Sequence, residues 1–141
     1  MEQYSIFPYS DYQDEEIKQL YKSVGWNSYL RYPELLPKAY AHSLKTFAAY
    51  VGERLVGIIR AVGDGISILY IQDLLVHPEY QRKGIGKRLI TEMLNAYPDV
   101  NQTVLLTDDS DETTGFYESA GFQKVQLAGC CSFIRLHGYY G

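Results

Sequence analysis

The sequence has 141 residues, enough for a single domain over 1–141 with its own core, and 46% of them are hydrophobic. Its 17 acidic residues outnumber 13 Lys and Arg, and the net charge of −4 argues against a general nucleic-acid-binding protein. No apolar stretch approaches the roughly 20 residues of a membrane span, and no early stretch has signal-peptide length. We therefore expect a cytoplasmic protein without nucleic acid or membrane as partner.

The cysteines and histidines predict neither a disulfide framework nor a metal site. Cys130 and Cys131 are adjacent, and a bridge between chain neighbours closes a strained ring. His42, His77 and His137 occur singly, without the spacing that a zinc site needs. The sequence predicts free thiols in a reducing compartment and no bound metal.

The N-terminal part of the chain predicts a strand or arm, at residues 1–10, followed by two helices. The first helix is indicated by apolar residues at helical spacing and ends at Gly25. An irregular aromatic loop at 26–33 leads to the second helix, at about 34–43. The apolar positions of the first helix are Ile17, Leu20, Tyr21 and Val24.

A hairpin and a central strand are predicted in the middle of the chain. Residues 47–51 and 55–62 are rich in strand-forming residues and are separated by a short turn. Asp64 and Gly65 then turn the chain into a central strand at 67–76. Both alternate sets of that strand are largely apolar, so we expect neighbours on both of its faces.

Strict alternation along the central strand would place Asp73 and Tyr70 on opposite faces. A helix follows, and then a strand at 103–107, so the crossover predicts that this strand runs parallel to the central one. The helix is indicated by apolar residues at Ile85, Leu89, Met93 and Leu94.

The C-terminal part of the chain predicts one more helix, which carries Tyr117. Ser110 or Asp111 can cap its start, and Gly121 stands where a helix commonly ends. Closing strands are predicted at 122–127 and 132–136, with a tail at 138–141.

Basic residues gather at the predicted start of the helix that follows the central strand. A helix N-terminus carries partial positive charge and normally attracts acidic residues. A phosphate or pyrophosphate on the exposed backbone N–H groups would explain the cations, and Gly84 and Gly86 would let it approach closely. The alternative is a solvated basic turn. The cations are Arg82, Lys83, Lys87 and Arg88.

Two familiar phosphate-binding motifs fail here. A dinucleotide fingerprint needs a glycine at Leu89, and a nucleoside-triphosphate loop needs Gly at Gln81 and Ser or Thr at Arg88. Residues 81–86 match instead the acetyl-CoA signature Gln/Arg-x-x-Gly-x-Gly/Ala. With 74–80 before them and 116–122 downstream, they resemble the GNAT family of N-acetyltransferases, in wording closest to the plant serotonin N-acetyltransferase branch and its bacterial relatives.

The resemblance implies an α/β (α+β) GNAT fold, with a mixed central sheet of six to seven strands, a splayed parallel pair and about four helices. It implies acetyl-CoA as co-substrate and transfer of its acetyl group to the primary amine of a small molecule, by direct attack in a ternary complex. The alternatives are a non-catalytic acetyl-CoA-binding module and an enzyme that acetylates protein or peptide amines. Many members pair through terminal strands, so a homodimer is compatible.

The resemblance also assigns residues to the cofactor. Leu74, Leu75 and Val76 would bind the pantetheine arm with free backbone groups where the central strand splays from its neighbour. The usual asparagine seven residues before the tyrosine is Ser110 here. The remaining cofactor-binding residues are Gln81, Arg82, Lys83, Gly84, Ile85, Gly86, Lys87, Arg88, Phe116 and Tyr117.

Tyr117 is the expected proton donor to the departing thiolate. The glutamate that serves as base in histone-type members corresponds to Tyr70, so Asp73 and Asp109 are the candidate bases, with a water chain as a third option. Aromatic residues fit an arylalkylamine acceptor or simply pack the loop onto the body. The predicted substrate-binding residues are Trp26, Tyr29, Tyr32 and Tyr70.

Overall fold

A computed structural model of the protein describes residues 3–137. The chain divides into two compact units, of which the first ends at Leu106 and the second begins at Thr107. The predicted tail at 138–141 and the first two residues of the predicted N-terminal arm lie outside the described residues.

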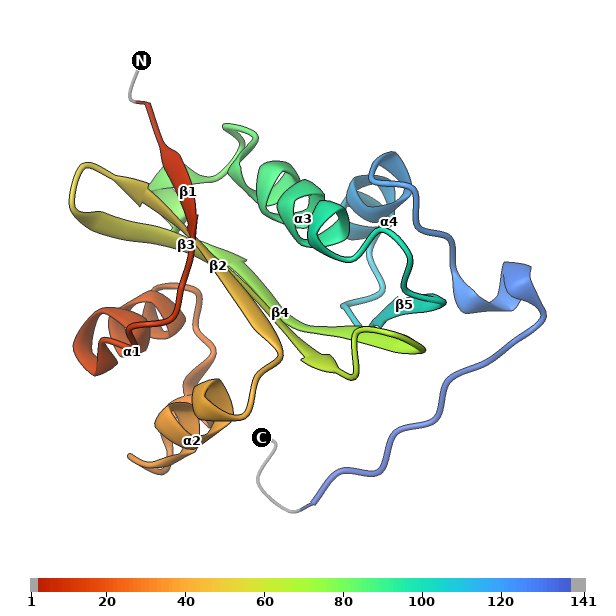
Figure 1. The fold of residues 1–141 in the computed structure, drawn as a ribbon, viewed down its shortest axis with the longest axis horizontal. Coiled ribbons are helices and arrows are strands. Elements are labelled where there is room, and N and C mark those ends of the chain that lie inside the picture. The colour runs from red at the N-terminus through yellow and green to blue at the C-terminus, as the bar shows by residue number, and fades with distance from the viewer. Residues whose placement is uncertain (1–2, 138–141) are drawn as a thin grey trace. The chain divides into compact units, whose positions relative to one another are not determined.

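The first unit is built on one five-stranded sheet in the order β1-β2-β3-β4-β5 (Figure 1). The neighbouring strands are antiparallel except for β4 and β5, which are parallel as predicted. Its elements are β1 (Ser5–Pro8), α1 (Asp14–Ser23), the 3-10 helix η1 (Asn27–Leu30), α2 (Leu35–Ala41), β2 (Lys45–Val51), β3 (Arg54–Gly63), β4 (Ile68–Val76), the 3-10 helix η2 (Pro78–Tyr80), α3 (Ile85–Ala96) and β5 (Gln102–Leu105).

Helices cover both faces of this sheet. Figure 1 shows α3 on one side and α1 with α2 on the other. On the α3 side the packing is close, because a Cβ added to Gly57 of β3 would lie 3.1 Å from the side chain of Leu89 of α3. On the α1 side a buried cluster unites the helices with β2, β3 and β4, and comprises Ile17, Leu20, Tyr21, Leu36, Ala48, Leu55, Ile58 and Leu75.

Strand β4 carries a bulge at Gln72. Arg60 pairs with Asp73 and Ala61 pairs with Ile71, so Gln72 is an extra residue without a partner on β3. The bulge corrects the prediction from strict alternation. Tyr70 pairs with a residue of β3 two positions from Arg60, and paired residues share a face, so Tyr70 and Asp73 lie on the same face.

The parallel pair separates halfway along β4. The pairing runs from Ile68 with Gln102 to Ile71 with Leu105, where β5 ends. Within the first unit, the rest of β4, from Gln72 to Val76, therefore has a partner strand on the β3 side only.

The second unit contains α4 (Asp111–Ser119) and a short 3-10 helix, η3 (Val125–Ala128). Ser110 caps α4 as predicted, because its Oγ accepts a hydrogen bond from the backbone N–H of Thr113 at 3.2 Å. Gly121, at a φ of 95°, follows the end of the helix, and the N–H of Phe122 donates to the carbonyl of Tyr117 at 3.0 Å.

The predicted closing strands are wrong for the described residues, so the sheet has five strands rather than six or seven. In place of the first, local bonds form η3, including Cys130 N–H to the carbonyl of Val125. The second has the apolar composition of a strand, but Phe133 is 92% exposed and Ile134 is 67% exposed. A strand needs a neighbour to pair with, and composition alone does not provide one.

The turn from β3 into β4 depends on Gly63. Its φ is 126°, and a Cβ would lie 2.5 Å from the carbonyl oxygen of Ile68. We expect Gly63→Ala to lower the free energy of unfolding by about 2 kcal/mol or more, because left-handed strain and a backbone clash add. Urea denaturation measures the change.

Gly52 offers the matched control, since it has a φ of 60° but nothing within 4 Å of an added Cβ. Gly52→Ala should cost only about 1 kcal/mol, from backbone strain alone. Equal losses for the two variants would contradict the clash at Gly63.

Candidate active site

The loop after β4 turns sharply before α3 begins. Arg82, with a φ of 64°, is the one non-glycine residue of the described chain with a positive φ, and Gly84 has a φ of 85°. Gly84 is the N-cap of α3 and offers no side chain to its N–H groups. Gln81 Nε2 donates to the carbonyl of Val76 at 2.8 Å, which ties the loop to the end of β4.

The start of α3 presents positive charge in a favourable position for an anion. No acidic residue stands in its first turn, and the backbone N–H of Arg88 is the first to bond back, to the carbonyl of Gly84 at 3.1 Å. Arg82, Lys83 and Lys87 are exposed around these free N–H groups. The residues present therefore fit a diphosphate-binding site, and this interpretation is favoured over a solvated basic turn.

The ring of Tyr80 packs between the loop and β3. Its ring is buried, with Arg54 of β3 lying 5.5 Å and Lys83 lying 5.5 Å from its centroid. Arg54 also pairs with Glu79 at 3.3 Å, and the backbone N–H of Glu79 donates to His77 Nδ1 at 3.1 Å. His77 thus caps η2, which is a positional role.

A buried ion pair lies on the α1 side of the sheet. Arg60 of β3 contacts Asp73 of β4 through Nε and through its terminal nitrogen, each at 2.8 Å, and the side chains are 5% and 2% exposed. Burial alone would lower the pKa of Arg60, but the carboxylate of Asp73 outweighs it and holds the pKa above its usual value. The guanidinium of Arg60 therefore stays charged.

Tyrosine hydroxyls complete the surroundings of Asp73. Tyr21 of α1 donates to Oδ2 at 2.8 Å and Tyr29 of η1 donates to Oδ1 at 2.6 Å. Tyr40 of α2 shares a hydrogen bond of 2.9 Å with Tyr21. Burial, and then the charge of Asp73, raise the pKa of Tyr29, so its phenol remains protonated. Asp73 is bonded on both oxygens and is 2% exposed, so its carboxyl group has little access to a substrate amine.

Tyr29 connects the loop at η1 to the point where the parallel pair separates. It accepts a hydrogen bond from Gln72 Nε2 at 3.2 Å, and Trp26 lies 6.3 Å from its ring. Tyr70, whose pKa is raised by burial and by the charge of Asp73, shares this face. The structure thus groups three of the four predicted substrate-binding residues, while Tyr32 is 45% exposed in the loop after η1.

In the second unit, Tyr117 is half-buried between two aromatic rings. The ring of Phe116 lies 5.0 Å away and that of Phe122 lies 5.9 Å away. Burial, and then the charge of Asp108, raise the pKa of Tyr117 above its ordinary value of 10.0. The phenol therefore carries its proton at neutral pH.

Polar residues before α4 have structural partners. Asp109 pairs with Lys124 at 3.5 Å and is 94% exposed. Ser110 Oγ donates to the hydroxyl of Thr113 at 3.0 Å besides capping the helix. Asp108, which sequence reasoning passed over, accepts from the same threonine hydroxyl at 3.1 Å. Asp109 as base and Ser110 as cofactor contact stay predictions.

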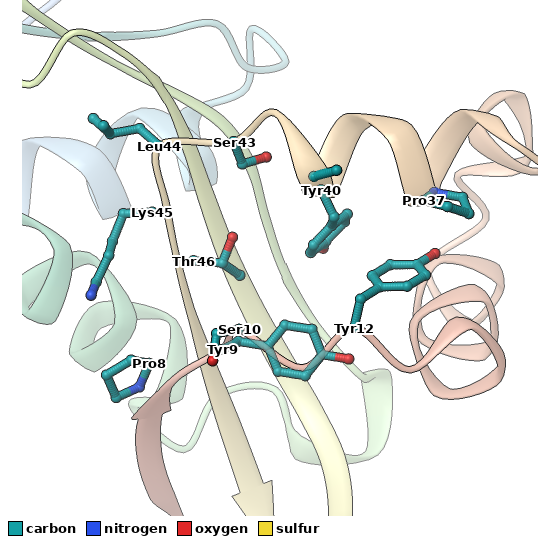
Figure 2. Close-up of a pocket in the computed structure, with 11 residues that line it drawn as sticks. Pro8, Tyr9, Ser10, Tyr12, Pro37, Tyr40, Ser43, Leu44, Lys45 and Thr46 are labelled. Carbon is teal, nitrogen blue, oxygen red and sulfur yellow. The ribbon is translucent and has the colours of Figure 1, made fainter.

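A cavity of about 470 Å³ opens beside α2 in the first unit (Figure 2). The rings of Tyr9, Tyr12 and Tyr40 gather around it, and Lys45 extends away from them. None of the predicted site residues lines it. Its lining comprises Pro8, Tyr9, Ser10, Tyr12, Pro37, Tyr40, Ala41, Ser43, Leu44, Lys45 and Thr46.

A family model described as an acetyltransferase (GNAT) domain matches residues 9–139 of the chain. The chain belongs to the GNAT acetyltransferase family. It is 32% identical over 124 residues to a ycf52-like N-acetyltransferase of Prochlorococcus marinus, covering 84% of this chain and 67% of that relative. The chain thus spans about two thirds of that relative's length.

Solved structures of GNAT proteins share the fold. A GNAT family acetyltransferase from Streptococcus pneumoniae is 36% identical, covers 96% of this chain and 98% of its own, and has a TM-score of 0.87. The PaiA N-acetyltransferase of Thermoplasma acidophilum, in complex with coenzyme A, has a TM-score of 0.69 over 86% of this chain and 91% of its own, and at 19% identity shows the fold alone. The predicted α/β GNAT fold is confirmed, with the smaller strand count given above.

Two other features are absent from the part of this GNAT chain that the structure describes. No group of three or more His, Cys, Asp or Glu side chains could hold a metal ion among residues 3–137. No helix within that range is long and apolar enough to cross a membrane.

The Arg60–Asp73 pair should be costly to break. Arg60→Met leaves a buried carboxylate without its cation, so we expect the free energy of unfolding to fall by about 3–5 kcal/mol. The double variant Arg60→Met with Asp73→Leu removes both charges and should regain only part of that loss, because the hydroxyls of Tyr21 and Tyr29 then lose their acceptor. Urea denaturation of the three proteins decides it.

The exposed pair of Arg88 and Glu92, at 3.5 Å, supplies the control. Glu92→Gln should change the free energy of unfolding by less than about 0.5 kcal/mol. If Arg60→Met were equally mild, the stability of the fold would not depend on the buried pair.

Proposed function

We propose that this GNAT protein transfers the acetyl group of acetyl-CoA to the primary amine of a small molecule, by direct attack in a ternary complex. One observation carries the proposal: β4, open on the β5 side beyond Ile71, leads through the left-handed turn at Arg82 and Gly84 into the basic start of α3. The same stretch offers an edge for an extended arm and a seat for a diphosphate. The family membership supports this reading.

The cofactor would be held along this stretch. N–H groups from Gln81 to Lys87 bind the diphosphate, and the exposed cations neutralise its charge. Backbone groups of Leu74, Leu75 and Val76 bond the pantetheine arm as an added strand would. A thioester laid along the open edge of β4 is aligned for attack, and such alignment contributes much of the rate.

The reaction forms one bond and breaks another. The lone pair of the neutral amine forms the C–N bond to the acetyl carbon, and the C–S bond breaks with its electron pair going to sulfur. Tyr117 gives its phenolic proton to that sulfur, and solvent later restores the proton to the phenol. The proton lost by the nitrogen passes to Asp109 or through water to solvent.

The engagement of Asp73 bears on the choice of base. Its bonds to Arg60, Tyr21 and Tyr29 favour a structural role, so a water chain or Asp109 is the better candidate in our proposal. Tyr70, at the position of the family glutamate, supplies no carboxylate. This absence keeps a second candidate function, a non-catalytic acetyl-CoA-binding module, as a distinct outcome of the test. Cytoplasmic location, homodimer and a single domain over 1–141 stay predictions.

Binding and transfer can be measured separately. We expect calorimetry to detect acetyl-CoA binding, and a thiol-release assay with a panel of arylalkylamines, polyamines and peptide N-termini to detect transfer to small amines. Binding without transfer would support the binding module, and transfer to peptides alone would support an enzyme of protein amines. No binding at millimolar acetyl-CoA would overturn the proposal.

The donor role of Tyr117 predicts a specific kinetic change. Tyr117→Phe should lower kcat by about 10²-fold, near the low end for general-acid catalysis, because a raised pKa makes the phenol a weak acid. The KM for acetyl-CoA should change little. The control Tyr97→Phe alters a tyrosine at the end of α3 and should leave kcat unchanged. Normal turnover by Tyr117→Phe would rule out its role in a rate-limiting step.

A further inference from the structure

We propose that Gln72 orients the acceptor amine, because its Oε1 accepts a hydrogen bond from one N–H group of the amine. Tyr29 is the positioning residue that holds the Gln72 amide in this orientation. The inference rests on the proposed function and names the acceptor side of the same site. It follows from three features of the first unit: the bulge in β4, the hydrogen bonds around Asp73 and the end of β5.

The bulge sets Gln72 apart from the rest of β4. It is the one residue of the strand that is exposed, and it has no partner on β3. Bulges commonly occur beside functional sites, where they redirect a side chain. Gln72 is also the first residue beyond Ile71, the last residue of β4 that pairs with β5. Its side chain therefore stands where the parallel pair opens.

The direction of the Gln72 amide follows from counting protons. Asp73 pairs with Arg60 at 2.8 Å and accepts hydrogen bonds from the hydroxyls of Tyr21 and Tyr29. Tyr29 has one hydroxyl proton and gives it to Asp73 Oδ1 at 2.6 Å. Towards Gln72, Tyr29 can therefore only accept, and it takes the bond from Nε2 at 3.2 Å. The carbonyl Oε1 of Gln72 is left pointing away, and among the described residues it has no hydrogen-bond partner.

A carbonyl acceptor suits a nucleophilic amine. When Oε1 accepts a hydrogen bond from one N–H group of the amine, the amine nitrogen keeps its lone pair free for the thioester carbon. The C–N bond can then form as the C–S bond breaks. Arg60 cancels the charge of Asp73, so this wall offers no net negative charge to a polycation. The substrate class that fits is a primary monoamine with an uncharged body, whose apolar part can lie against Trp26 and Tyr70.

A double-mutant cycle tests the pairing of Gln72 with Tyr29. The variants are Gln72→Met, which keeps the shape without the amide, Tyr29→Phe and the two combined. For 2-phenylethylamine we expect each single variant to raise the KM of the amine about three- to tenfold, the worth of one hydrogen bond, with kcat and the KM of acetyl-CoA little changed. Because Tyr29 acts through Gln72, the double variant should match Gln72→Met alone.

Two further variants separate positioning from folding. Gln102→Met makes the same change at an exposed position of β5 and should leave all constants unchanged. Gln72→Glu places a carboxylate beside the hydroxyl oxygen of Tyr29, which already donates its proton to Asp73. This variant should therefore also raise the KM of the amine, and it serves as the test if Tyr29→Phe fails to fold. Spermidine should be acetylated less efficiently than 2-phenylethylamine by the wild-type protein.

The outcomes distinguish this inference from the proposed function. An active wild type with an unchanged KM in Gln72→Met, or additive effects in the double variant, overturns the inference and leaves the proposed function standing. Efficient acetylation of spermidine overturns the substrate class. A wild type that binds acetyl-CoA but transfers nothing overturns the proposed enzyme function and the inference with it.

Discussion

The buried ion pair between Arg60 and Asp73 determines how the α1 side of this GNAT protein is arranged. A buried pair of this kind contributes little net stability, because desolvation offsets the attraction, but it joins β3 to β4 at one position. The hydroxyls of Tyr21 and Tyr29 both donate hydrogen bonds to the carboxyl group that Arg60 holds in place. One charge pair thereby sets hydrogen-bond directions in α1, η1 and β4.

The separation of β4 from β5 follows from two local features, the early end of β5 and the bulge in β4. Strand β5 is short and stops opposite Ile71, and the next residue of β4 is the bulged Gln72. A bulge bends its strand and increases the local twist, which carries the rest of β4 away from its parallel neighbour. Gly84 and Arg82 then turn the chain at the end of the same strand. Within the first unit, the part of β4 beyond Ile71 has no β5 partner, and it leads through this turn to a basic helix start.

Much of this arrangement could be predicted from the sequence. The hairpin, the central strand, the parallel crossover and the helix after Gly84 follow from periodicity and turn residues, which are local properties. The family resemblance predicted the fold class, and the comparisons confirmed it. The bulge could not be foreseen, because a single inserted residue leaves the apolar pattern of β4 nearly intact while it reverses the face of Tyr70 relative to Asp73.

The sequence did not predict the ion pair, and it wrongly predicted the closing strands, for different reasons. One charge within each of two apolar strands, Arg60 and Asp73, was a visible hint that they meet, yet the register that joins them is a tertiary property. For 122–127 and 132–136 the composition was typical of strands, but pairing depends on a neighbour that local pattern does not specify.

The left-handed backbone at Arg82 restricts what evolution can do at this position. Valine, isoleucine and threonine would be strongly disfavoured there, because branching at Cβ crowds the carbonyl in that conformation. Glycine or asparagine would relax the backbone but would forfeit a cation beside the mouth of α3. Among GNAT sequences descended from this one, we therefore expect position 82 to exchange arginine for lysine far more often than for glycine or asparagine.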